Sequence, residues 1–237
     1  MSPALGILVG VSLVLYLRAI YLGPVWQVYL FKPLTTTLIF AGAVLAAQRQ
    51  ARESAAARYG RSICVGLLCS VAGDVLLMLP RNRFVAGLGA FLLAHLCYIG
   101  AFTSQAGPRA TWRVGIPYVL VLAVLLALLL PHTGGLRLPA VAYAAALVGM
   151  AWQAAERWHA VRGSGPAAAA AGGALFIASD AALAADRFVA PFDAASLVIM
   201  GTYVAAQWLI AASIGPVRPG LRLRRRYDDA EVFESRR

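Results

Sequence analysis

Long, uninterrupted blocks of apolar residues constrain this chain more than any other feature. Hydrophobic residues make up 61% of its 237 positions, and charged residues only 13%. A soluble domain carries about 25% charged residues, whereas a helix needs about 20 apolar residues to cross a bilayer. We therefore predict an all-α integral membrane protein with eight transmembrane helices. The predicted spans are Ala4–Leu17, Leu34–Ala47, Ser62–Leu79, Phe84–Thr103, Trp112–Leu130, Pro139–Trp152, Pro166–Ala185 and Ala194–Ser213.

The basic residues are distributed unequally between the loops. With eight spans, fifteen of the 21 Lys and Arg residues lie on the side of the two termini. Because basic loops stay in the cytoplasm, we expect cytoplasmic termini and a place in a bacterial inner membrane. Residues 1–215 would form the membrane domain, and 216–237 a basic, disordered tail. The net charge of +11 is scattered among loops and this tail, which favours contact with anionic lipids and no nucleic-acid partner.

Two aspartates, Asp74 and Asp180, lie inside apolar blocks. The other eight acidic residues, Glu156 among them, fall in predicted loops, at span ends or in the tail, where we expect solvated charges. A carboxylate inside hydrocarbon costs a few kcal/mol, so it should face a cavity or a partner. Both aspartates precede the end of their block by five residues, which places them about 7–8 Å inside the same membrane face. One carboxyl of such a pair would ionise and the other keep its proton, as acid–base catalysis requires. The alternative is a pair of polar residues that only join helices.

Five further polar residues are candidates for lining the same cavity. His95 is the only histidine in an apolar block, and Tyr98 follows it on one helical face. Tyr203 and Gln207 share a face of the last span, and Lys32 stands just before the second. For the first four, ordinary helix packing remains the alternative, and for Lys32 it is interfacial anchoring. We expect no cofactor and no metal, because histidines and cysteines do not cluster as zinc ligands do.

The surroundings of the two aspartates are similar to each other. Arg83-Phe84-Val85-Ala86 begins nine residues after Asp74, and Arg187-Phe188-Val189-Ala190 begins seven residues after Asp180. A tyrosine follows each aspartate by 24 and 23 positions, respectively. The spacing of four spans predicts a parallel four-plus-four repeat, as in some transporters.

Several short segments, in order along the chain, carry a resemblance to a known family. They are Lys32-Pro33-Leu34, Gly73-Asp74-Val75-Leu76-Leu77-Met78, Ala94-His95-Leu96-Cys97-Tyr98, Phe176-Ile177-Ala178-Ser179-Asp180, Arg187-Phe188, and Tyr203 with Ala206-Gln207-Trp208. Together they resemble the lysoplasmalogenase (YhhN-type) family of eight-span membrane proteins.

The resemblance implies hydrolysis of the vinyl-ether bond of a lysophospholipid-type substrate, giving a fatty aldehyde and a glycerophospho-headgroup. It implies that Asp74 and Asp180 are catalytic and that His95, Tyr98, Tyr203, Gln207 and Lys32 bind substrate or water. The residues themselves leave a second function open, because two buried acids also suit a proton-coupled transporter or a lipid-binding membrane protein. Headgroup, chain length, physiological substrate, oligomeric state and the identity of the proton donor are not fixed by the sequence.

Overall fold

The computed structural model describes residues 2–50, 55–79, 83–105 and 107–215. Within these ranges, eight helices are long and apolar enough to cross a membrane, which confirms the predicted all-α class and number of spans. They are α1 (Pro3–Leu22), α2 (Val25–Gln48), α3 (Ala55–Met78), α4 (Phe84–Thr103), α5 (Trp112–Leu129), α6 (Arg137–Val161), α7 (Ser164–Ala184) and α8 (Ala195–Ala212). Two 3₁₀ turns, η1 (Leu130–His132) and η2 (Gly134–Leu136), join α5 to α6, and a π-helical turn, η3 (Ala185–Val189), extends α7.

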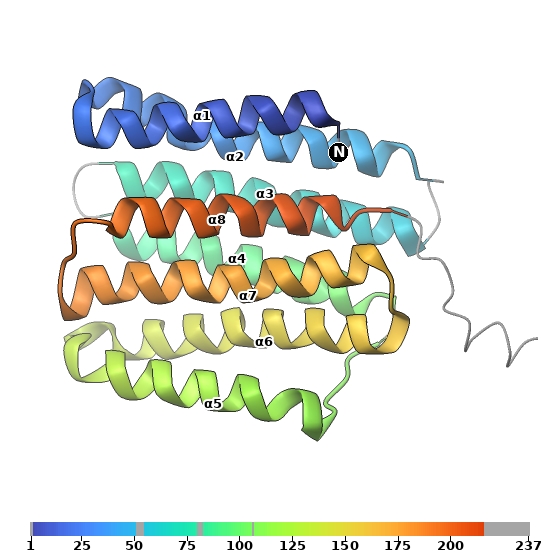
Figure 1. The fold of residues 1–237 in the computed structure, drawn as a ribbon. Coiled ribbons are helices and arrows are strands. Elements are labelled where there is room, and N and C mark those ends of the chain that lie inside the picture. The colour runs from blue at the N-terminus through green and yellow to red at the C-terminus, as the bar shows by residue number, and fades with distance from the viewer. Residues whose placement is uncertain (1, 51–54, 80–82, 106, 216–237) are drawn as a thin grey trace, which may run out of the picture.

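Six helices form a closed ring. α2 packs on α3, α3 on α4, α4 on α6, α6 on α7, α7 on α8, and α8 returns to α2. α1 lies outside the ring against α2 and α8, and α5 lies at the opposite edge, packed mainly along α6 (Figure 1). The start of α1, the end of α2, the start of α3, the end of α4, the start of α5 and the α6–α7 connection lie at one end of the bundle. The ring therefore encloses an interior. The C-terminal ends of α3 and α7, which carry the two aspartates, lie at the end of the bundle away from the N-terminus.

Helix α2 is longer than the sequence pattern predicted. It begins at Val25, so Lys32 and Pro33 lie inside the helix rather than ahead of it. A proline removes one backbone donor from a helix, and membrane helices tolerate such a residue. Here the Thr35 hydroxyl donates to the Phe31 carbonyl at 2.7 Å and contacts the Ser12 hydroxyl at 2.7 Å. The longer helix carries the Lys32 side chain into the interior of the protein.

Glu156 contradicts the expectation of a solvated loop charge. Helix α6 continues to Val161, and Glu156 is only 2% exposed. Its carboxylate accepts hydrogen bonds from the Thr111 backbone N–H at 2.6 Å and hydroxyl at 2.9 Å, where α5 begins. The neighbouring Arg157 is also buried and donates to Gln105 and Tyr59. Such partners compensate the cost of burying polar groups, and the sequence pattern showed the charges without showing these partners.

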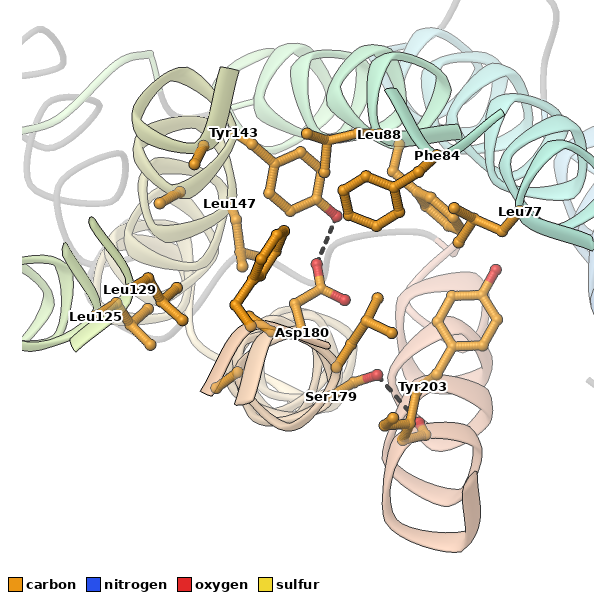
Figure 2. Close-up of a pocket in the computed structure, with 18 of the residues that line it drawn as sticks. Leu77, Phe84, Leu88, Leu125, Leu129, Tyr143, Leu147, Ser179, Asp180 and Tyr203 are labelled. Atoms are coloured by element: carbon orange, nitrogen blue, oxygen red, sulfur yellow. Dashed lines mark hydrogen bonds between the residues drawn. The ribbon is translucent and has the colours of Figure 1, made fainter. Parts of the chain in front are cut away.

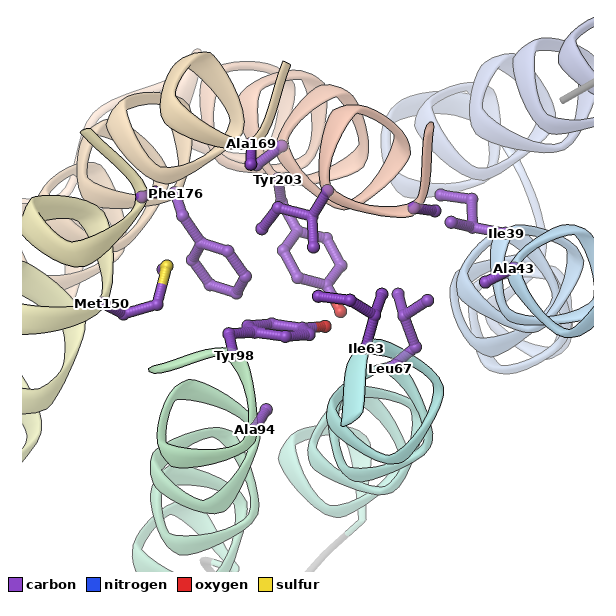
Figure 3. Packing of buried hydrophobic residues seen from close by; sticks show 14 of the residues in the cluster. Ile39, Ala43, Ile63, Leu67, Ala94, Tyr98, Met150, Ala169, Phe176 and Tyr203 are labelled. Atoms are coloured by element: carbon purple, nitrogen blue, oxygen red, sulfur yellow. The ribbon is translucent and has the colours of Figure 1, made fainter. Parts of the chain in front are cut away.

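Small residues allow α7 to pack closely, as its alanine- and glycine-rich sequence predicts. Gly173 lies against the backbone of Ala151 in α6, and Gly172 lies against the Ala206 carbonyl in α8. Larger side chains fill the centre of the ring, including Phe176 and Tyr203, which meet edge to face with ring centroids 5.6 Å apart (Figure 3). These aromatic side chains lie at the boundary of a cavity, which Tyr203 also lines.

Candidate active site

A cavity of about 120 Å³ lies where α3 and α7 end inside the ring. Its polar lining includes Asp74, Asp180, Lys32, Tyr143 and Tyr203, of which Figure 2 labels Asp180, Tyr143 and Tyr203. The rest is largely aliphatic or aromatic and comes chiefly from α4, α5, α6 and α7. These apolar residues include Leu77, Phe84, Leu88, Phe91, Leu125, Leu129, Leu136, Leu147, Leu183 and Phe188. A cavity with one polar region and otherwise apolar walls suits an amphiphilic ligand.

Asp74 is held by donors from two neighbouring helices. The Thr36 hydroxyl of α2 donates to Oδ2 at 2.6 Å, and the Tyr203 hydroxyl of α8 donates to the same oxygen at 2.9 Å. The Lys32 ammonium lies 3.9 Å from Oδ1, and the Asp74 side chain is 2% exposed. A buried carboxylate is tolerated only with such partners. The two hydroxyls fix Oδ2, and Oδ1 is the oxygen nearer the cation.

Asp180 is held differently and is more accessible. The Tyr143 hydroxyl of α6 donates to its Oδ2 at 2.5 Å (Figure 2). His95 Nε2 lies 3.7 Å from the same oxygen and 3.2 Å from the Tyr143 hydroxyl oxygen. The Asp180 side chain is 12% exposed, and that of His95 is not exposed at all. Asp180 therefore reaches the cavity, with Tyr143 between it and the buried imidazole.

The remaining predicted site residues divide into two groups. Tyr203 and Lys32 line the cavity and contact Asp74. Tyr98 and Gln207 lie deeper in the ring, where the Tyr98 hydroxyl donates to Gln207 Oε1 at 2.8 Å (Figure 3 shows Tyr98). His95 lies behind Tyr143. His95, Tyr98 and Gln207 are not among the residues that line the cavity. Two of the five predicted binding residues, Tyr203 and Lys32, therefore line it.

Sequence reasoning missed Tyr143 and Thr36. Tyr143 is the only tyrosine in the alanine-rich span of α6, and an isolated phenol in a small-residue helix was a usable signal. Thr36 lies four residues after Lys32 on α2, and this spacing puts both on one helical face. Because α2 was predicted to begin at Leu34, that relation could not be seen.

The two similar Arg-Phe segments meet at the edge of the cavity. Phe84, at the start of α4, and Phe188, in η3, pack edge to face with centroids 5.8 Å apart. The Arg187 guanidinium lies 3.8 Å from the centre of the Phe84 ring. Both phenylalanines line the cavity, and the cation–π contact ties η3 to α4. Within the described ranges, three or more His, Cys, Asp or Glu side chains do not converge on any point.

Comparison with known proteins identifies the family of this chain. The model of the YhhN family matches residues 27–214. This chain belongs to the YhhN family. The match covers α2 to α8 almost completely, and so includes every residue of the cavity described above. No protein of known structure is detectably similar.

Individual relatives in the YhhN family carry two kinds of name. The uncharacterized membrane protein YhhN of Escherichia coli O6:H1 is 32% identical over 209 residues, which cover 88% of this chain and 97% of the relative. A lysoplasmalogenase of Mycobacterium bovis is 37% identical over 168 residues, covering 65% of this chain and 60% of the relative. The human lysoplasmalogenase TMEM86B is 39% identical over 151 residues, covering 62% and 60%. Similarity at this level therefore links the chain to enzymes as well as to an uncharacterized relative.

Proposed function

We propose that this protein is a membrane hydrolase that cleaves the vinyl-ether bond of lysoplasmalogens by two-aspartate acid–base catalysis. The observation that carries the proposal is the cavity that Asp74 and Asp180 line together. Relatives named lysoplasmalogenase supply the substrate class. The two acids supply chemistry that such a substrate needs.

A vinyl ether requires a proton donor more than it requires a nucleophile. Protonation of the carbon β to the ether oxygen gives an oxocarbenium ion, water adds to this cation, and the resulting hemiacetal splits into an aldehyde and an alcohol. One carboxylic acid delivers the proton, and a neighbouring carboxylate stabilises the cation and directs water. Glycosidases divide the work between two carboxyls in the same way.

The lining of the cavity fits a single-chain lipid. Its charged and hydroxyl groups come from α2, α3, α6, α7 and α8 and from Thr133 between η1 and η2, and leucines of α4, α5 and α6 supply much of the apolar surface. The alkenyl chain would lie along the leucines, with the ether linkage at the aspartates. Lys32 carries the positive charge that lies nearest to Asp74, and it would attract the lipid phosphate.

The orientation in the membrane follows from charge. Fifteen of the 21 basic residues lie on the side of the termini under the eight-span topology, so that side would face the cytoplasm. The cavity would then lie in the opposite half of the bilayer and take substrate from that leaflet. The basic tail lies outside the described residues, so its predicted disorder stays a prediction, as does the four-plus-four repeat.

The direct test uses purified protein with a lysoplasmalogen and, separately, with an ester lysophospholipid. We expect aldehyde from the first and no fatty acid from the second. In D₂O the aldehyde should carry deuterium on the carbon next to its carbonyl, because that carbon takes the catalytic proton.

The two aspartates provide the matched variants. Asp74→Asn and Asp180→Asn should each lower aldehyde release by at least a thousandfold while the protein still elutes as one species. The proposal fails if either variant keeps wild-type activity. Movement of substrate in proteoliposomes without product would favour the alternative of a proton-coupled transporter.

A further inference from the structure

A chain of two hydrogen bonds connects a buried histidine to Asp180. The Tyr143 hydroxyl donates to Asp180 Oδ2 at 2.5 Å, and His95 Nε2 lies 3.2 Å from the Tyr143 oxygen. Because the phenol hydrogen points to Asp180, the Tyr143 oxygen can only accept from the imidazole. His95 therefore carries its hydrogen on Nε2. The chain runs from His95 through Tyr143 to Asp180.

The other nitrogen of His95 lies in apolar surroundings. Nδ1 is buried and has no hydrogen-bond partner among the described residues. An aromatic ring, Phe176, lies edge to face with the imidazole at 4.8 Å between centroids. His95 therefore offers Asp180 a hydrogen-bond chain through the Tyr143 hydroxyl.

Asp74 has the opposite surroundings. The Lys32 ammonium lies 3.9 Å from its Oδ1, and the hydroxyls of Thr36 and Tyr203 donate to its Oδ2. The Lys32 ammonium therefore lies beside Asp74, whereas the contacts of Asp180 are a hydroxyl and an imidazole. The titratable groups around the pair are Lys32 from α2, Tyr203 from α8, Tyr143 from α6 and His95 from α4, with Tyr16 of α1 near Asp74.

From this asymmetry we infer that Asp180 is the proton donor, that Asp74 is the permanent carboxylate, and that Tyr143 and His95 are positioning residues for Asp180. The inference rests on the proposed vinyl-ether hydrolysis and assigns the two roles within it. Before reaction, Asp180 holds its proton on the oxygen that faces the cavity. After transfer, the Tyr143–His95 chain stabilises the new carboxylate through the donor on Oδ2.

The reaction begins with proton transfer from Asp180 to the substrate. The Asp180 O–H bond breaks and its electron pair stays on the carboxylate, while the π electrons of the vinyl ether form a C–H bond at the β-carbon. Asp74 stabilises the oxocarbenium ion electrostatically. Water adds to the cation and gives one proton back to Asp180. The hemiacetal then splits as its hydroxyl proton moves to the leaving ether oxygen, which restores the resting enzyme.

The roles can be separated by pH–rate profiles of kcat for aldehyde release. The wild-type profile should be bell-shaped, rising as Asp74 ionises and falling as Asp180 loses its proton. Tyr143→Phe removes a donor that favours the Asp180 carboxylate, so the alkaline limb should move to higher pH by about one unit, the effect of one hydrogen bond to a charged group. Lys32→Met removes the cation beside Asp74, so the acid limb should move to higher pH by a similar amount while the alkaline limb stays in place.

Substitutions of His95 test the outer part of the chain. His95→Leu should move the alkaline limb in the same direction as Tyr143→Phe, by less. His95→Gln, which can still donate an N–H to Tyr143, should restore it. Tyr118→Phe in α5, which does not line the cavity, is the matched control and should leave both limbs unchanged.

The outcomes separate this inference from the proposed function. If the wild-type protein releases no aldehyde, the proposed function fails and the role assignment fails with it. If aldehyde is released but Tyr143→Phe leaves the alkaline limb in place, the assignment alone is overturned. An acid limb that responds to Tyr143→Phe and an alkaline limb that responds to Lys32→Met would exchange the roles of the two aspartates.

Discussion

Replacing a single leucine of α5 tests the proposal that the cavity accommodates an alkenyl chain. Leu125 and Leu129 are four residues apart on α5 and both line the cavity (Figure 2). Leu128, the adjacent residue, points away and is 59% exposed. Leu129→Trp fills part of the apolar space, whereas Leu128→Trp adds the same ring on the face that points away. The pair keeps composition and helix constant and changes only the direction of the added bulk.

The expected magnitude follows from the area that the chain loses. If the ring displaces two or three methylene groups, the loss is about 0.8 kcal/mol for each. The total of about 2 kcal/mol corresponds to a decrease of about 15- to 60-fold in kcat/KM. The decrease should apply to long alkenyl chains and largely disappear for short ones, which do not reach the filled space.

The assay compares kcat/KM for lysoplasmalogens that differ only in alkenyl length, using wild-type protein, Leu129→Trp and Leu128→Trp. A length-dependent loss in Leu129→Trp, with Leu128→Trp close to wild type, is expected. Equal losses in the two variants, or a loss that does not depend on length, would refute the placement of the chain along α5.

Two further substitutions test the supports of the site and of the ring. Tyr203→Phe removes the hydroxyl that donates to Asp74 at 2.9 Å and should lower kcat by about 10- to 100-fold, the effect of one hydrogen bond to a charged group, measured at the pH optimum of each protein. Gly66→Ala would place a methyl group inside the ring of the buried Tyr98 and should destabilise the protein by about 1–3 kcal/mol, seen as earlier thermal unfolding in detergent. Gly89→Ala, where a methyl group meets nothing within 4 Å, is its control, and equal unfolding temperatures for the two alanine variants would contradict the packing argument.

The apolar blocks predicted the number of helices because the bilayer demands a fixed length of apolar helix. They did not predict helix ends that lie among polar residues. Val25 begins α2 nine residues ahead of the predicted start, and the helix continues through Pro33. Glu156 is buried because the start of α5, far away in sequence, supplies its donors.

In the candidate site, too, the sequence predicted residues with a local signal and missed a partner from a distant helix. Asp74 and Asp180 were recognisable because a carboxylate inside an apolar helix is rare, and the structure lines one cavity with both. Their catalytic roles remain a proposal. Tyr143, the partner of Asp180, comes from a helix that the sequence pattern left without function. Pairing of this kind depends on how α6 is rotated against α7, and helical periodicity alone does not fix that rotation.

The position of α5 outside the six-helix ring has a consequence for adaptation. The side chains that hold Asp74 and Asp180 come from α2, α4, α6 and α8, all members of the ring. The leucines of α5 stand on a helix packed mainly along a single neighbour. Under the proposed function, changes in α5 would alter the length of the lipid chain that the cavity accepts without moving either aspartate. Relatives would then differ in chain-length preference while they share one reaction.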